Sequence, residues 1–76
     1  MDQRDTLISE FVLSYKKIRK LGNRFSLKIL ESMCFEIEDK IKEFKITKEE
    51  VQLLNNHNIS NEDILKFIEA FNPYLL

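Results

Sequence analysis

The chain has two side chains of the types that form a nucleophile and its base, Cys34 and His57. Cysteine catalysis needs a histidine within hydrogen-bond reach, because the histidine activates the thiol. Cys34 falls within an apolar helical repeat, where a thiol packs as a small hydrophobe, and His57 lies in a predicted connection about 20 residues further on. We therefore expect no catalytic residues and predict that the protein is not an enzyme.

The acidic side chains do not form a predicted metal site. Glu36 and Asp39 share one face of a predicted helix at i, i+3. Helical metal sites combine such carboxylates with a histidine at Glu-x-x-His spacing, and no histidine follows here. The single glycine also excludes a glycine-rich phosphate loop. We expect no metal and no cofactor.

A basic cluster is the clearest charge feature. No acidic residue occurs from Phe11 to Leu30, and residues 1–30 carry seven Lys or Arg and three Asp or Glu, whereas residues 31–76 carry five and ten. The cluster could balance the carboxyl end of the first helix and the acidic second helix. It could also bind a polyanion or an acidic partner, because grouped cations attract such surfaces. Both interpretations stay open for Lys16, Lys17, Arg19, Lys20, Arg24 and Lys28.

Apolar periodicity predicts two long helices that position these residues. A stripe that runs from Leu7 to Leu21 at 3/4 spacing indicates a helix over about 4–21, ending near Gly22. A second helix, over about 25–45, is indicated by apolar residues at intervals of 3, 4, 3, 4 and 3: Leu27, Leu30, Cys34, Ile37, Ile41 and Phe44. So short a connection folds the two helices into an antiparallel hairpin.

The remainder of the chain predicts two short helices. Thr47 with Glu50 is a capping box, and Ser60 with Asp63 is its aspartate analogue, which places helices near 48–56 and 61–71. Pro73 ends the last one. The fold class is all-α: one domain over 1–76, with a long hairpin at 1–45 and a short helical pair with an apolar tail at 46–76. The expected core is Leu7, Phe11, Ile18, Leu27, Leu30, Cys34, Ile37, Ile41, Phe44, Val51, Leu54, Ile64 and Ile68.

Composition excludes several other classes of protein. With 43% hydrophobic and 33% charged residues, the 76-residue chain is too apolar for disorder. No apolar run exceeds three residues, whereas a membrane span needs about 20. The single cysteine cannot form an intramolecular disulfide, and no basic-then-apolar leader opens the chain. We expect a cytoplasmic protein with no membrane partner.

Five apolar residues lie off the predicted stripes: Phe35, Phe67, Tyr74, Leu75 and Leu76. Exposed apolar clusters tend to mark interfaces, so we expect these residues to bind a protein. The predicted function is a non-enzymatic protein–protein interaction module, a small cytoplasmic regulator that binds and occludes or bridges its partner. A homodimer through helix 25–45 is a second arrangement that the same residues allow.

The segment 46–67 resembles two families of regulators. Its capped helix at Thr47, followed by Ile59-Ser60 and a second helix, resembles the helix-turn-helix of phage-repressor-type and excisionase-type proteins. That resemblance implies an alternative function, a DNA-binding transcriptional regulator that uses 47–71, with the basic cluster contacting the DNA backbone. Acids at the start of the would-be recognition helix, in Asn61-Glu62-Asp63, depart from the pattern.

The second resemblance is to the helical hook of SinI-type anti-repressors, which heterodimerise with a repressor. It covers only the last third of the chain and implies protein binding. The family's tryptophan is missing, and the connection is about one helical turn shorter. The matching residues are Glu50-Val51, Leu53-Leu54, Ile59-Ser60, Glu62, Ile64, Lys66 and Phe67. Because the two resemblances imply different functions, neither assigns the chain to a family.

Overall fold

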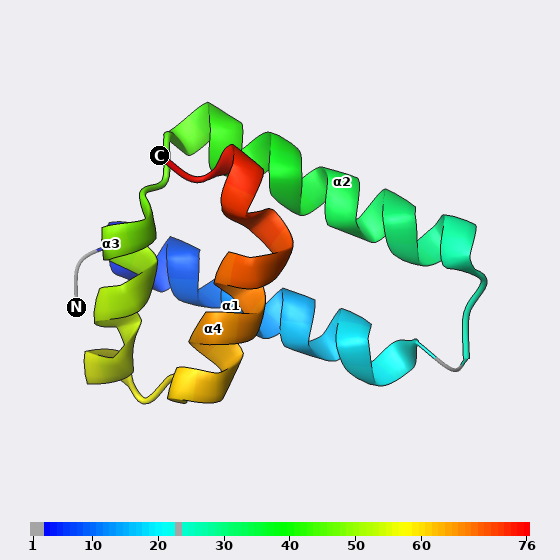
Figure 1. Cartoon of the computed structure of the whole chain (residues 1–76), viewed down its shortest axis with the longest axis horizontal. Helices are drawn as coiled ribbons and strands as arrows, with labels where there is room; N and C mark the ends of the chain where they lie inside the picture. Colours follow the sequence, from blue (N-terminus) through cyan, green and yellow to red (C-terminus); the bar gives the residue numbers. More distant parts are fainter. Residues whose placement is uncertain (1–2, 23) are drawn as a thin grey trace.

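The computed structural model describes residues 3–22 and 24–76, and these form helices joined by short connections (Figure 1). No strand occurs among them, so the predicted all-α fold is confirmed. The two long helices run antiparallel as a hairpin, and the shorter ones follow. In chain order the elements are α1 (Gln3–Leu21), α2 (Leu27–Phe44), α3 (Lys48–Gln52), the 3-10 turn η1 (Leu53–His57), α4 (Asn61–Phe71) and the 3-10 turn η2 (Asn72–Tyr74).

Local capping sets the ends of the helices. The Ser26 hydroxyl accepts a hydrogen bond from the Ile29 amide at 3.3 Å, so α2 begins at Leu27, two residues later than predicted. The predicted capping box at α3 is confirmed. The Thr47 hydroxyl accepts from the Glu50 amide at 3.1 Å, and the Glu50 carboxylate accepts from the Thr47 amide at 3.1 Å.

Two local predictions are corrected. The helix predicted over 48–56 is an α-helix only to Gln52 and continues as the η1 turn, which Asn58 ends with a left-handed φ of 64°. Poor helix propensity at Asn55-Asn56 accounts for the change. Gly22, expected as the C′ residue that ends α1, does follow Leu21, but it has no positive φ, so it lacks the left-handed conformation common at that position.

Helix α4 organises the core because it packs across the hairpin and contacts α1 (Figure 1). The rings of Phe67 and Phe71 on α4 contact the Tyr15 ring of α1, and Ile8 and Val12 of α1 belong to the same buried core. The buried core consists of Ile8, Val12, Ile37, Ile41, Ile46, Val51, Leu54, Ile59, Ile64, Phe67, Phe71 and Leu75.

The predicted burial of Leu27 and Phe44, at the two ends of α2, is wrong. Leu27 is 72% exposed, although it opens the predicted apolar repeat of α2. The ends of α1 and α2 next to the turn extend beyond α4, so none of the other described helices covers them (Figure 1). At the opposite end of α2, Phe44 is 37% exposed. Leu30 is half-buried.

The buried side of α1 also differs from the prediction. Leu7 is only half-buried, and Ile8 and Val12 are the fully buried residues instead, since α1 packs against α3 and α4 as well as against α2. Phe11, Ile18, Cys34 and Ile68 are half-buried and pack against the edge of the core, whereas the expected burial of Ile37, Ile41, Val51, Leu54 and Ile64 is confirmed.

The last residues pair with the connection between α2 and α3. The Leu76 amide donates to the Ile46 carbonyl at 3.0 Å, and the Lys48 amide donates to the Leu76 carbonyl at 3.1 Å. Leu75 is buried beside them. These backbone bonds hold the η2 turn close to α2.

Candidate functional site

A groove of about 400 Å³ between α1 and α2 is the candidate site, and we call it the α1–α2 groove. It opens on a different face of α1 from the one that contacts α4, because Tyr15 and Arg19 face α4 whereas Ser14 and Ile18 face the groove. All its described lining residues come from the hairpin: Phe11, Ser14, Lys17, Ile18, Leu21, Met33, Glu36, Ile37 and Lys40.

The groove has an apolar floor and charged edges. Ile37 is buried, and Phe11 and Met33 are half-buried, whereas Lys17 and Lys40 are exposed. Ser14 has no bulk to fill the space between the helices. A serine within an otherwise apolar α1 stripe was the one signal in the sequence that could have indicated this hollow.

The structure divides the basic cluster into two sets. Lys16 and Arg19 are bound within the chain, because the Asp63 carboxylate contacts the Lys16 ammonium at 3.1 Å and the Arg19 guanidinium at 3.0 Å. Asp63 also lies in the first turn of α4, where a carboxylate complements the helix dipole. Four exposed cations form no ion pair with any described residue: Lys17, Lys20, Arg24 and Lys28. Binding of a polyanion or acidic partner stays a prediction for these four.

The expected surface of off-stripe apolar residues needs correction. Phe67 is 0% exposed and Leu75 is 8% exposed, so both belong to the core. Tyr74 is half-buried, with the Lys42 ammonium 4.9 Å from its ring centre. Only Phe35 and Leu76 are well exposed, at 57% and 70%. A binding role for these two stays a prediction.

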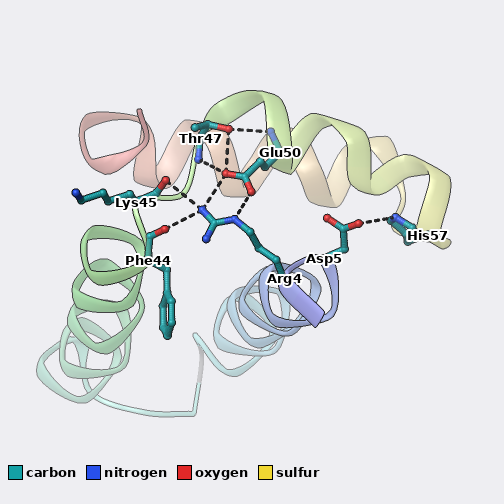
Figure 2. Close-up of polar contacts among 7 residues, drawn as sticks. All are labelled: Arg4, Asp5, Phe44, Lys45, Thr47, Glu50 and His57. Carbon is teal, nitrogen blue, oxygen red and sulfur yellow. Dashed lines mark hydrogen bonds and ion pairs between the residues drawn. The ribbon is translucent and has the colours of Figure 1, made fainter. Parts of the chain in front are cut away.

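Cys34 and His57 are not brought together as a catalytic pair. Burial raises the pKa of the Cys34 thiol, and the carboxylates of Glu38 and Glu31 raise it further, so the nucleophilic thiolate is disfavoured. The imidazole Nε2 of His57 lies 3.4 Å from the Asp5 carboxylate instead (Figure 2). Within residues 3–22 and 24–76, no three His, Cys, Asp or Glu side chains converge as a metal site.

A polar network at the start of α1 fixes the open end of the hairpin. Arg4 donates to the Phe44 carbonyl at 2.7 Å and the Lys45 carbonyl at 3.2 Å, at the carboxyl end of α2 (Figure 2). Its guanidinium also binds both carboxylate oxygens of Glu50, one of them at 3.1 Å. Since Glu50 completes the capping box with Thr47, one side chain joins α1, α2 and α3.

Replacing Arg4 by Met, which keeps the apolar stem but removes the guanidinium, is expected to lower the free energy of unfolding by about 1–2 kcal/mol. The loss stays modest because both Arg4 and Glu50 are partly exposed to solvent. Urea denaturation followed by circular dichroism measures it. Arg24→Met is the matched control, since Arg24 is exposed and forms no ion pair with any described residue. Equal stability of the two variants would contradict a structural role for Arg4.

Comparison with known protein families, curated proteins and solved structures returned no match to this chain. Among the described helices, none has both the length and the apolar character that crossing a membrane requires. The functional argument therefore depends on the residues themselves, and it is built on the α1–α2 groove.

Proposed function

We propose that this protein is a non-catalytic protein-binding module, a small cytoplasmic regulator that occludes or bridges a partner protein. The observation that carries the proposal is the α1–α2 groove, where apolar side chains such as Phe11 and Met33 line a hollow to which α3 and α4 contribute no residue. Apolar hollows edged by charged residues are typical of surfaces that bind protein segments. The reducing location is inferred from the single cysteine.

Duplex DNA is not the partner we propose. Helix α4 would be the recognition helix, but its exposed side chains include Glu62 and Glu69 beside Lys66. Acids on that surface would repel phosphates, which supply most of the affinity for DNA. In addition, two residues of the basic cluster are already bound to Asp63.

The proposal is tested by affinity capture of the tagged protein from its source cells, with and without nuclease. Ser14→Trp fills the groove, whereas Ser32→Trp places the same bulk on an exposed part of α2 that does not line it. We expect a stoichiometric protein that survives nuclease, is retained by Ser32→Trp and is lost with Ser14→Trp. Thermal melting by circular dichroism confirms that both variants fold.

Two results would contradict this function. The first is capture of nucleic acid alone, or of no stoichiometric protein. The second is a partner that Ser14→Trp and Ser32→Trp retain equally, because the groove would then not be the binding surface.

A further inference from the structure

We propose that the α1–α2 groove binds one amphipathic helix of the partner protein, and that this helix carries acidic residues along its flanks. The inference rests on the proposed function and names the chemistry of the segment that the groove would accept. It depends on three properties of the groove: the spacing of its lining residues, its concave shape and the charge along its edges.

The spacing of the lining residues suits a third helix. On α1 they recur at intervals of 3, 4 and 3, as Phe11, Ser14, Ile18 and Leu21, and Met33 and Ile37 provide the facing row on α2. Two such rows form holes that accept side chains of an added helix packed lengthwise. From Phe11 to Leu21 the row is about 15 Å long at about 1.5 Å per residue, which corresponds to about three helical turns.

The concave shape suits a single helix as the occupant. A second copy of this chain would have to meet the groove through the same patch of its own surface, an arrangement that sedimentation distinguishes. The hollow of about 400 Å³ is lined by both helices of the hairpin. A convex element such as a single helix, with a large apolar side chain directed at Ser14, fills it.

The charge along the groove favours acidic flanks on that helix. Lys17 lines the groove from α1 and Lys40 from α2, against one acid, Glu36. Lys17 forms no ion pair within the described part of the chain, and the 3.4 Å contact of Lys40 with Glu43 is exposed to solvent and therefore weak.

The test is selection from a displayed library of helix-forming 20-residue peptides against the immobilised full chain. We expect the selected peptides to share apolar residues at i, i+3 or i+4, and i+7, flanked by Asp or Glu. Their dissociation constants for the protein are then measured by fluorescence anisotropy. Ser14→Trp is expected to weaken binding at least about tenfold, and Ser32→Trp less than about twofold.

Reversing the charge of the two groove lysines tests whether the acidic flanks of the peptide contribute to binding or whether the apolar contacts suffice. The double variant Lys17→Glu, Lys40→Glu is expected to weaken binding of the selected peptides at least about tenfold, and added salt is expected to weaken binding to the unaltered protein. Lys66→Glu is the matched control on the exposed side of α4, and we expect less than about a twofold effect.

Several outcomes overturn the inference. They are the absence of enriched peptides, selected peptides that are basic or lack helical spacing, and binding that Ser14→Trp or the charge reversal leaves unchanged. Sedimentation showing a dimer that Ser14→Trp disrupts would assign the groove to a second copy. If capture finds a groove-dependent partner while the selected peptides are not acidic helices, only this inference fails. If acidic helical peptides bind but capture finds no partner, the proposed function fails instead.

Discussion

Replacing Phe67 by Ala is expected to lower the free energy of unfolding by about 3–5 kcal/mol, the range for deleting a buried phenylalanine ring. The side chain is fully buried, and its ring centre lies 4.8 Å from that of Phe71 and 6.2 Å from that of Tyr15. Small domains are stable by about 5–15 kcal/mol, so much of the total would be lost. Urea denaturation followed by circular dichroism measures the change.

Phe35→Ala is the matched control, because Phe35 is a phenylalanine on the exposed side of α2. We expect it to change the free energy of unfolding by less than about 0.5 kcal/mol. Similar losses in the two variants would show that Phe67 does not occupy the core. The same pair of variants separates stability from binding, since only Phe35 is accessible to a partner.

Replacing Asp63 by Asn is expected to lower the free energy of unfolding by about 2–3 kcal/mol, because it removes charge-assisted bonds to Lys16 and Arg19. The Asp63 side chain is 10% exposed, whereas its partners Lys16 and Arg19 are 39% and 27% exposed, so water screens the interaction in part. Asparagine has nearly the same shape, and the hydrogen bond from the residue 63 amide to Ser60 does not depend on the charge. Asp39→Asn removes an exposed carboxylate from α2 and serves as the matched control.

The stabilising effect of Asp63 is expected to depend on pH. The interaction with Lys16 is the largest cause of a lowered pKa of the Asp63 carboxyl group, and Ser60 and Arg19 lower this pKa further. The folded protein therefore holds this proton less tightly than the unfolded chain, in which the pKa is about 3.9. The stabilisation is complete above that value and is lost as the pH falls through the lower pKa of the folded state.

Denaturation of the unaltered protein and of Asp63→Asn across this pH range tests the sign of the effect. The difference in their free energies of unfolding should be constant near neutral pH and should narrow below pH of about 4. A difference that widens on acidification would contradict the assigned ion pairs.

The pairing of Asp63 with the basic cluster changes how that cluster is interpreted. In sequence, its six cations were equivalent candidates for a polyanion site. In the structure Lys16 and Arg19 stabilise the contact between α1 and α4, and Lys17 lines the α1–α2 groove. The cluster therefore combines a structural role with a positive surface beside the candidate binding site.

The sequence by itself determined the helices, because the signals that form them are local. The box of Thr47 and Glu50 and the cap at Ser60 involve residues three positions apart, so they correctly placed the starts of α3 and α4. Apolar spacing of 3 and 4 correctly indicated the two long helices, and the short connection between them correctly indicated that they run antiparallel. Ile37 and Ile41 were correctly placed in the core. The predicted end of α3 was wrong, because the α-helix ends at Gln52 and the segment that contains the weak helix formers Asn55-Asn56 forms the η1 turn.

Only the tertiary structure decided which face of each helix is buried. Periodicity predicts an apolar stripe along each helix. Which residues of the stripe become fully enclosed depends on where the other helices pack, and for this reason Ile8, Val12 and Phe67 are buried while Leu27 is exposed. The contacts of Asp63 with Lys16 and Arg19 join residues more than 40 positions apart, with no local signal. The α1–α2 groove exists because α3 and α4 leave that side of the hairpin uncovered, and such a hollow is a property of packing rather than of any single helix.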